Sequence, residues 1–300
     1  MRFPRSAVLF CVLIAGCGGA TAVQPGTGVR AATAAGPVAT LPARPSGPKW
    51  LPELSKELQA ERVTGSIALF DTQEGVLGCS DVDKCQEAVL PASTFKIPHS
   101  MVAFETGAVE TPDTVIAWDR QSYSNVDWNQ DLKFRDAFRL SCVPCYRDIA
   151  RKVGATGEQE WLNKLGYGNR DMSGAADMFW LRGGLRISPV EQIDFLRRFD
   201  GNQLPISERT ADWVRDIMTL DVTEKYVLRG KTGSTAPPEQ LRELGWFVGW
   251  LELGERRVFF ATLLDGHAAD VDRLSVRRRV TERVLRARGY LPALSILPDL

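Results

Sequence analysis

Ser93 and Lys96 stand three residues apart in the stretch Leu90-Pro91-Ala92-Ser93-Thr94-Phe95-Lys96-Ile97-Pro98, where the sequence predicts the start of a helix. Positions i and i+3 share one face of a helix, with Cβ atoms roughly 5–6 Å apart, so the Lys96 amine can reach the Ser93 hydroxyl. A serine becomes an effective nucleophile when a neighbouring base takes its proton. The pair indicates covalent catalysis, although Ser-x-x-Lys alone is a common pattern and needs support from residues further along the chain.

A second motif, Lys231-Thr232-Gly233, follows a predicted strand. Together with Ser-x-x-Lys it forms part of one signature of penicillin-recognising enzymes. The lysine would supply a fixed positive charge and the threonine a hydroxyl for a substrate carboxylate, while the glycine would let a ligand lie close to the strand. For this tripeptide alone, a hairpin strand that ends in glycine is the alternative interpretation.

A third motif distinguishes between classes of such enzymes. Ser141-Cys142-Val143 stands where penicillin-recognising proteins usually carry Ser-x-Asn, and valine cannot hydrogen-bond to the Lys96 amine. With this motif the chain resembles the class D (oxacillinase-type) β-lactamases. The matching segments are Pro-Ala-Ser-Thr-Phe-Lys-Ile-Pro at 91–98, Ser141-x-Val143, Tyr167-Gly168-Asn169, Phe179-Trp180-Leu181, Lys231-Thr232-Gly233 and Gly245-Trp246-Phe247-Val248-Gly249-Trp250.

The resemblance implies a nucleophile and its base. Ser93 is similar to the family serine that opens the β-lactam ring and forms an acyl-enzyme, and Lys96 to the lysine that carbon dioxide converts to a carbamate, the general base. Burial favours a neutral amine and lowers the pKa of a lysine, and only a neutral amine attacks carbon dioxide. Trp180 resembles the tryptophan whose indole N–H, a donor only, holds the carbamate.

The resemblance also implies supporting roles around the substrate. Ser141 is similar to the hydroxyl that relays a proton to the leaving nitrogen, and the backbone amides of Ser93 and Ser234 would form the oxyanion hole. Val143 and Leu181 resemble the apolar pair beside the carbamate. The substrate carboxylate would be bound by Lys231, Thr232 and Arg277, beside Gly233. Arg277 resembles the family arginine near the start of the final helix, and Arg273, Arg278 or a solvated basic face are the alternatives. Tyr167-Gly168-Asn169 is a family marker with no evident catalytic proton.

Composition narrows the classes of partner. The chain has 37 basic and 37 acidic residues among 300, which argues against a nucleic-acid partner and gives no polybasic patch for anionic lipids. With His99 and His267 as the only histidines, we expect no zinc site. The predicted partner is a small β-lactam molecule and the predicted cofactors are none, apart from carbon dioxide on Lys96. The oligomeric state stays open.

The first residues predict export. Basic Arg2 and Arg5 precede an apolar run that is too short to span a membrane as a mature helix, as in a secretory signal. Ile14-Ala15-Gly16-Cys17 resembles a bacterial lipobox, and an ordinary signal peptide is the alternative. The predicted divisions are a signal peptide over 1–16, a lipidated Cys17 with a disordered linker over 17–48, the β-lactamase domain over 49–292 and a tail over 293–300. The protein would be periplasmic and membrane-anchored through lipid only.

Four cysteines remain in the predicted domain. Cys79 and Cys85 flank a polar stretch that is typical of a turn after a strand, and an exported protein permits disulfides. We therefore expect a Cys79–Cys85 disulfide. Cys142 and Cys145 match the redox pattern Cys-x-x-Cys, but no parallel strand is predicted before them, and core thiols are the favoured interpretation. Whether these two are paired stays open.

Hydrophobic spacing predicts an α+β fold. Helices are expected over 50–60, 93–107, 132–138, 143–153, 159–165, 189–199, 211–220 and 273–288, and strands over 63–70, shortly after 75, and over 226–232, 246–252 and 257–264. Strands near both chain ends imply an antiparallel sheet assembled from them, with a helical block inserted between.

Two other functions share these motifs. A non-hydrolytic β-lactam sensor domain and a penicillin-binding D,D-peptidase would both acylate and then hydrolyse the acyl-enzyme slowly. Sensors carry several membrane spans and a signalling module, and the sequence indicates neither. The segment Ser234-Thr235-Ala236-Pro237-Pro238 departs from the family pattern beside the substrate, so the range of β-lactams is not transferred by the resemblance.

Overall fold

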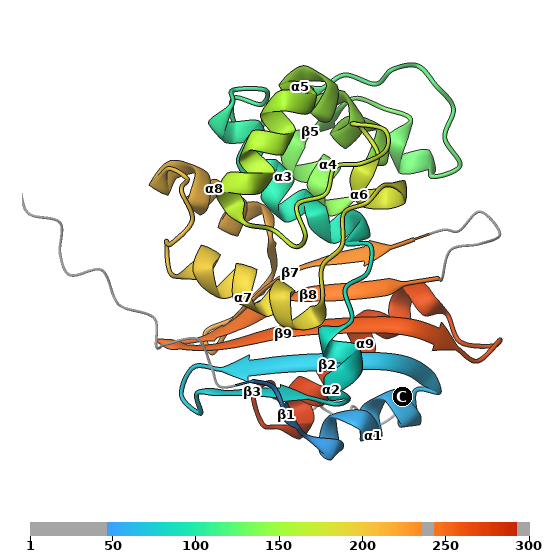
Figure 1. Ribbon diagram of the computed structural model, residues 1–300, viewed down its shortest axis with the longest axis vertical. Coiled ribbons are helices and arrows are strands. Elements are labelled where there is room, and N and C mark those ends of the chain that lie inside the picture. The colour runs from blue at the N-terminus through green and yellow to red at the C-terminus, as the bar shows by residue number, and fades with distance from the viewer. Residues whose placement is uncertain (1–46, 236–242, 293–300) are drawn as a thin grey trace, which may run out of the picture. The chain divides into compact units, whose positions relative to one another are not determined.

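The computed structural model describes residues 47–235 and 243–292 (Figure 1). The predicted signal peptide, the Cys17 lipid site, nearly all of the linker and the tail over 293–300 lie outside these residues. Within the described ranges no helix has the length and apolar character needed to cross a membrane.

The described residues form a seven-stranded sheet with the strand order β1-β3-β2-β9-β8-β7-β6. Neighbouring strands are antiparallel except β1 and β3, which are parallel. Because β2 lies beside β9, strands from the two ends of the chain meet in the middle of the sheet, as predicted. The bounds are β1 Lys49–Trp50, β2 Val63–Asp71, β3 Val76–Cys79, β6 Thr219–Val222, β7 Val227–Ser234, β8 Gly245–Leu253 and β9 Arg256–His267.

Both faces of the sheet are covered, because successive residues of a strand point to opposite faces. On β8, Trp246, Val248 and Trp250 belong to the apolar cluster that includes the inserted helices. Phe247 and Leu251 belong to a second cluster formed with α1 (Pro52–Ala60) and α9 (Arg273–Ala287). The sheet therefore separates two cores, and the helical block lies on one side of it (Figure 1).

The inserted block is mainly helical, as predicted. Its helices, together with those that join it to the sheet, are α2 Val82–Gln86, η1 Ala92–Phe95, α3 Lys96–Glu105, η2 Val126–Trp128, α4 Phe134–Arg139, α5 Val143–Leu165, α6 Phe179–Arg182, α7 Pro189–Asp200 and α8 Glu208–Ile217. The two helices expected over 143–153 and 159–165 form one element, α5, interrupted where Gly154 has a φ of 79°. The two-residue strands β4 (Val115–Ile116) and β5 (Leu132–Lys133) were not predicted.

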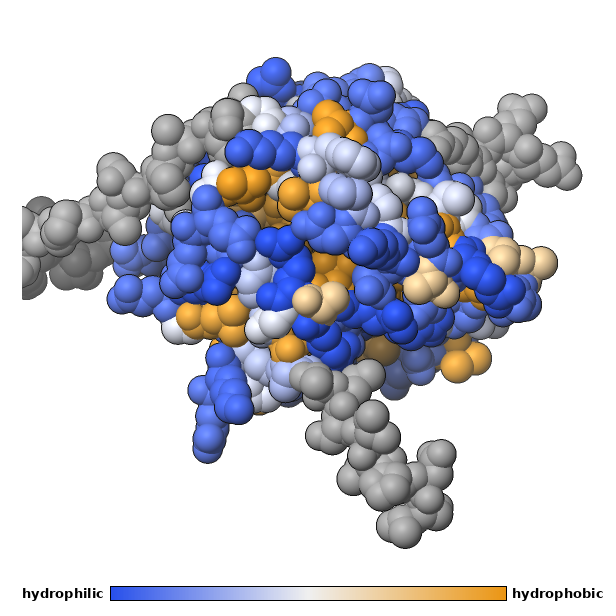
Figure 2. All heavy atoms as spheres, turned by 90° about the horizontal axis from the view of Figure 1, so that it is seen from below, coloured by the Kyte–Doolittle hydropathy of each residue, from blue (hydrophilic) through white to orange (hydrophobic). Residues whose placement is uncertain are grey.

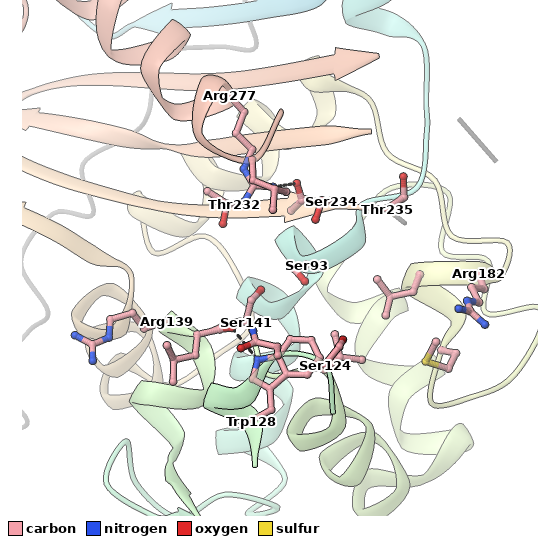
Figure 3. A pocket seen from close by; sticks show the side chains of 17 residues that line it. Ser93, Ser124, Trp128, Arg139, Ser141, Arg182, Thr232, Ser234, Thr235 and Arg277 are labelled. Carbon is pink, nitrogen blue, oxygen red and sulfur yellow. Dashed lines mark hydrogen bonds between the residues drawn. The ribbon is translucent and has the colours of Figure 1, made fainter. Parts of the chain in front are cut away.

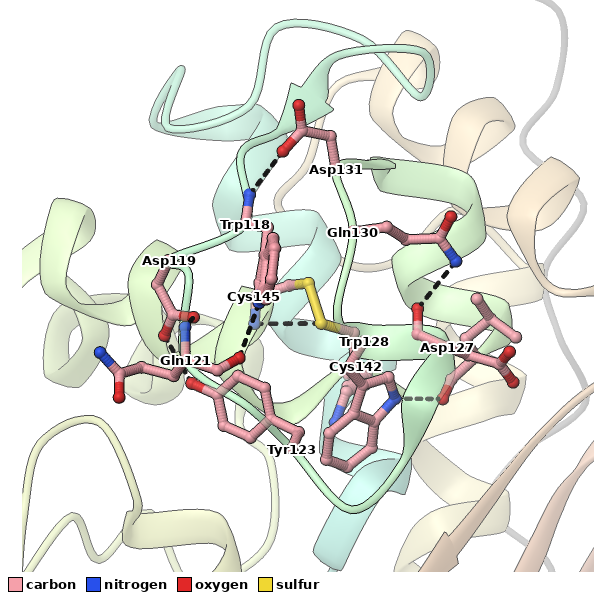
Figure 4. Close-up of a disulfide and its surroundings, with 12 residues drawn as sticks. Trp118, Asp119, Gln121, Tyr123, Asp127, Trp128, Gln130, Asp131, Cys142 and Cys145 are labelled. Carbon is pink, nitrogen blue, oxygen red and sulfur yellow. Dashed lines mark hydrogen bonds between the residues drawn. A yellow bond between two sulfur atoms is a disulfide. The ribbon is translucent and has the colours of Figure 1, made fainter.

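The predicted disulfide is wrong. Cys142 and Cys145 form a disulfide (Figure 4), whereas Cys79 and Cys85 are free, buried thiols. Cys142 caps α5 and Cys145 lies one turn later, so their Cα atoms are 5.4 Å apart, within the span that a disulfide bridges. The stretch before Cys85 is a short helix, capped by Asp81, instead of an open turn. Both free thiols face the core as small apolar side chains.

Candidate active site

Ser93 and Lys96 meet as the sequence predicts. A 3₁₀ turn, η1, carries Ser93 and runs directly into α3, which begins at Lys96. The Lys96 Nζ lies 3.1 Å from the Ser93 Oγ. Lys96 is fully buried, and this burial lowers its pKa from 10.5 to about 7. A substantial fraction of the amine is therefore neutral near pH 7, and a neutral amine can take a proton from serine or react with carbon dioxide.

The turn that presents Ser93 is held from several sides. Ala92, directly before it, has a φ of 50°, a left-handed conformation that costs energy for a residue with a Cβ. The Trp246 Nε1 donates a hydrogen bond of 2.9 Å to the Leu90 carbonyl, and the Thr94 Oγ1 donates one of 2.7 Å to the Pro91 carbonyl. These bonds fix the strained turn.

Tyr167, from the Tyr-Gly-Asn segment, supports the same turn from behind. The Gln192 Nε2 donates to both the Thr94 Oγ1 (2.9 Å) and the Tyr167 hydroxyl (3.0 Å). Asn169 binds the backbone of the facing loop through the Gly184 carbonyl and the Arg186 amide. This segment therefore supports the backbone next to Ser93.

Ser141 faces the second lysine of the site. The Lys231 Nζ donates a hydrogen bond of 2.9 Å to the Ser141 Oγ. Lys231 is buried, and burial, followed by the positive charges of Lys96 and Arg277, holds its pKa well below its usual range. Ser141 has a φ of 57°, so its backbone too is strained at the site. The pair can pass a proton between the Lys231 amine and a ligand group in the cavity that contacts the Ser141 hydroxyl.

Val143, Leu181 and Trp180 form the apolar side of the site. Val143 and Leu181 line the cavity, while Trp180 is fully buried behind it and stacks on Phe95 with ring centroids 5.6 Å apart. Among the described residues, the Trp180 Nε1 is a buried donor without a hydrogen-bond partner. Such a donor is costly to leave unpaired, and it fits a carbamate, because the oxygens of that group accept hydrogen bonds.

The predicted residues surround one cavity of about 700 Å³. Figure 3 shows Ser93 between β7, which carries Thr232 and Ser234, and the helical block, which carries Ser141. Among the predicted residues, those that line the cavity are Ser93, Ser141, Val143, Leu181, Thr232, Gly233, Ser234 and Arg277. Lys96, Trp180 and Lys231 are buried in its wall.

Gly233 allows β7 to approach the catalytic turn. A Cβ at this position would lie 3.1 Å from the Pro91 carbonyl oxygen and equally near the backbone nitrogen of Thr94. The Arg277 NH1 donates a hydrogen bond of 2.7 Å to the Gly233 carbonyl, which brings the guanidinium of α9 to the edge of the cavity. The role of the Ser93 and Ser234 amides as an oxyanion hole stays a prediction.

Several residues that line the cavity were missed from the sequence. They are Ser124, Asn125, Trp128, Arg139, Leu140, Met178, Arg182 and Leu274, whereas Thr235, which also lines the cavity, lies in the segment expected beside the substrate. Trp128 ends the short helix η2 in the segment before β5, and its Nε1 donates to the Leu140 carbonyl at 3.1 Å. This segment before β5 has no hydrophobic period that could place it over Ser93. The only sequence signal here is a polar stretch with aromatic and amide side chains, and such a composition does not predict where the stretch lies in the fold.

Within the described residues, no group of three or more His, Cys, Asp or Glu side chains is arranged to hold a metal ion.

Comparisons with known proteins agree on one family. The family described as the penicillin-binding protein transpeptidase domain matches residues 20–286. Beta-lactamase OXA-48 from Klebsiella pneumoniae is 37% identical over 76% of this chain and 84% of its own length, and beta-lactamase OXA-10 from Pseudomonas aeruginosa is 33% identical over 79% and 89%.

Solved structures give the same result. The class D β-lactamase YbXI from Nostoc superposes with a TM-score of 0.75 at 39% identity, covering 79% of this chain and 99% of that one. The class D β-lactamase FUS-1 (OXA-85) from Fusobacterium nucleatum subsp. polymorphum gives 0.76 at 29% identity, covering 81% and 100%.

Proposed function

Because the chain belongs to the class D β-lactamases, which are hydrolases, we propose that it hydrolyses penicillin-type β-lactams through an acyl-enzyme on Ser93, with carboxylated Lys96 as the general base. The Ser93 Oγ attacks the lactam carbonyl, the C–N bond of the ring breaks, and the nitrogen takes a proton. Water then cleaves the ester and restores the serine. The physiological result would be antibiotic resistance.

One observation carries the proposal for Lys96. Its amine lies 3.1 Å from the Ser93 Oγ and has a pKa of about 7 because it is buried. A carbamate on this amine, held by the Trp180 Nε1, would supply a base for both proton transfers. General-base assistance typically contributes about 10²–10⁴ in rate, and an ammonium could not give it. Val143 and Leu181 limit the access of water to the same space.

Ser141 and Lys231 supply the proton for the leaving nitrogen in this proposal. Their hydrogen bond of 2.9 Å connects a buried amine with a hydroxyl that lines the cavity. The amides of Ser93 and Ser234 stabilise the oxyanion, at roughly 2.7–4 kcal/mol for each donor by analogy with other hydrolases.

The substrate carboxylate is bound, in the same proposal, at the β7 edge of the cavity. Thr232 and Arg277 line this edge, and the buried Lys231 amine lies behind it. Gly233 leaves room for the ligand against the strand.

The mechanism is tested with enzyme that has been degassed and acid-treated. We expect activity to be low without bicarbonate and restored with it, and carbon-13 NMR after labelled bicarbonate to show a carbamate signal. Lys96→Ala should nearly abolish turnover, while Trp180→Ala should still acylate but depend strongly on bicarbonate. If there is neither bicarbonate dependence nor a carbamate signal, the base is the neutral amine and the mechanism is wrong.

Turnover separates a lactamase from the two alternatives. A sensor domain or a D,D-peptidase would release about one equivalent of product from nitrocefin and then stop. We expect sustained turnover, and a single stoichiometric burst would contradict the proposed function.

We also propose that the mature protein is exported and held at a membrane by lipid on Cys17. The support is the lipobox-like Ile14-Ala15-Gly16-Cys17 after an apolar run, and two or three acyl chains anchor a protein stably. Cys17→Ser should move the protein from the membrane fraction to the soluble fraction. An unchanged distribution would rule out this anchor.

A further inference from the structure

A buried acid–base pair lies behind the active site. The His99 Nε2 is 2.7 Å from the Glu158 Oε1, and both side chains are at most 1% exposed. His99 is on α3, one turn after Lys96, and Glu158 is on α5. The pair therefore connects the helix of the catalytic lysine to the neighbouring helix, and the proposed mechanism does not use it.

The ring of His99 belongs to the aromatic group around Lys96. It lies 5.3 Å from the Trp180 ring and 5.4 Å from the Tyr146 ring, between centroids. The Lys96 Nζ is 4.9 Å from the centroid of the same Tyr146 ring. His99 thus contacts both the indole proposed to hold the carbamate and the aromatic ring against which the amine rests.

Stability alone does not account for this pair. Buried ion pairs are often no more stabilising than apolar side chains of similar volume. Here two atoms of the pair, the His99 Nδ1 and the Glu158 Oε2, have no hydrogen-bond partner within the described residues, so the pair is also incompletely satisfied. Such a pair can instead fix a conformation, because a single short hydrogen bond sets the rotation of the imidazole ring.

The indole of Trp180 needs such a fixed neighbour. Its Nε1 must point at one place to bind a carbamate oxygen, yet that nitrogen has no partner among the described residues that would hold its direction. The indole is therefore oriented by packing, with Phe95 stacked on it and Phe179 and His99 beside it. Of these three rings, only the imidazole is itself anchored by a hydrogen bond.

We propose that His99 and Glu158 are positioning residues, which hold the Trp180 indole beside Lys96 and so raise the affinity of the lysine for carbon dioxide. This inference rests on the proposed carbamate mechanism. Glu158 fixes the rotation of the His99 ring from α5, and the ring fixes the indole.

The test compares the bicarbonate requirement of variants. Glu158→Leu removes the acceptor, Glu158→Gln keeps one, and Glu160→Gln, an exposed residue on the same helix, is the matched control. We measure the bicarbonate concentration that gives half-maximal nitrocefin turnover, and the carbon-13 carbamate signal at fixed bicarbonate. Glu158→Leu should raise the half-maximal concentration at least fivefold, while KM for nitrocefin at saturating bicarbonate stays within twofold of wild type. In Glu158→Gln the half-maximal bicarbonate concentration should return most of the way to the wild-type value, and in Glu160→Gln it should equal that value.

A second variant guards against a folding defect. In His99→Leu/Glu158→Leu the pair is replaced by apolar side chains, which we expect to fold, since such replacements of buried pairs are often neutral. It should show the same raised bicarbonate requirement, whatever its melting temperature. A requirement equal to wild type in this variant, with a normal wild-type carbamate signal, would overturn the inference alone. A wild-type enzyme without carbamate would overturn the proposed mechanism and this inference with it.

Discussion

Lys96 and Lys231 are two buried amines in one site, and each is easier to keep neutral than an exposed lysine. Burial is the first cause for both, and for Lys231 the charges of Lys96 and Arg277 add to it. A site with two ammonium groups would repel further positive charge and resist proton uptake. The catalytic arrangement thus carries an energetic cost that the rest of the fold must offset.

This cost can be measured by replacing Lys96. The folded-state pKa of about 7 is below the ordinary value of 10.5, so the unfolded chain binds more protons between these two pH values and stability rises with pH there. Burying the charged amine therefore destabilises the folded protein, and below pH 7 this destabilisation reaches its full value of roughly 5 kcal/mol. In buffer free of carbon dioxide, Lys96→Met should therefore be more stable than wild type at pH 7, by up to about that amount less the lost Ser93 hydrogen bond. Urea unfolding should show the advantage shrinking toward pH 10, and a constant difference would contradict the assignment.

Arg277 is expected to act in substrate binding. Its NH1 donates to the Gly233 carbonyl at the cavity edge, and a hydrogen bond to a charged group contributes about 1.5–3 kcal/mol. Arg277→Ala should raise KM for benzylpenicillin about tenfold or more with a small change in kcat, because the contact is present in ground and transition states alike. Arg278→Ala, an exposed residue paired with Glu282, is the control. Equal kinetics for both variants would remove Arg277 from the site.

The sequence predicts the chemistry-bearing residues better than those that support them. Ser93, Lys96 and Lys231 belong to short motifs whose spacing is fixed by one turn or one strand. The contact between His99 and Glu158 joins residues that are distant in the sequence, and it exists only because α3 packs on α5. No local pattern in either helix distinguishes a buried glutamate from the exposed Glu160 two positions later.

At the scale of elements, the first turn of α5 determines where Ser141 and Val143 stand. Cys142, between them, is the N-cap residue of the helix, and its sulfur is bonded to Cys145. The loop closed is very short, so the disulfide should stabilise by roughly 2 kcal/mol in the chain-entropy model. Its greater effect would be to hold the turn in which the backbone of Ser141 has a left-handed conformation.

Thiol mapping tests this arrangement. When the mature protein is denatured without reductant and alkylated, labels should appear on Cys79 and Cys85 and be absent from Cys142 and Cys145. Reduction of the folded enzyme should lower kcat several-fold, as Ser141 becomes less well held. Labels on Cys142 and Cys145, with none on Cys79 and Cys85, would instead support the Cys79–Cys85 disulfide predicted from the sequence.

The elements that sequence patterns predict are the long ones. Strands β2, β7, β8 and β9 were expected close to their observed bounds because their residues are apolar in runs or alternation. Strands β1, β4 and β5 have two residues each, too few for any period. Residues 219 and 220 were expected to end a helix, but they begin β6, where pairing with β7 overrides the local preference.

At the scale of the described unit, the buried residues of α9 pack on the face of the sheet opposite the helical block, while Leu274 and Arg277 of its first turns line the cavity. The buried residues Val276, Val280, Val284 and Leu285 of α9 belong to the cluster with α1. Figure 2 shows mainly hydrophilic side chains on the viewed face, with hydrophobic residues in small groups. The two apolar clusters are therefore the main source of stability, and only one of them adjoins the chemistry.

Stability and catalysis should be separable on this basis. Val280→Ala should lower the free energy of unfolding by roughly 2 kcal/mol, because removing the buried methyl groups leaves a cavity between α9 and the sheet. Its kcat and KM at 25 °C, per folded molecule, should equal those of wild type. Calorimetry and nitrocefin kinetics on the same sample give both values, and a changed KM would show that this cluster reaches the site.

The pairing of β2 with β9 sets the order in which the chain can fold during synthesis and secretion. Ala68 pairs with Ala261, so the centre of the sheet is absent from any nascent chain that has not yet produced its last strand. Contacts of such high sequence separation form slowly, and until then β2 has an open edge that favours aggregation. A chain stalled before β9 should be fully sensitive to protease, whereas the completed chain should resist it. In an exported chain, the same delay would leave the polypeptide unfolded while it is threaded through an export channel.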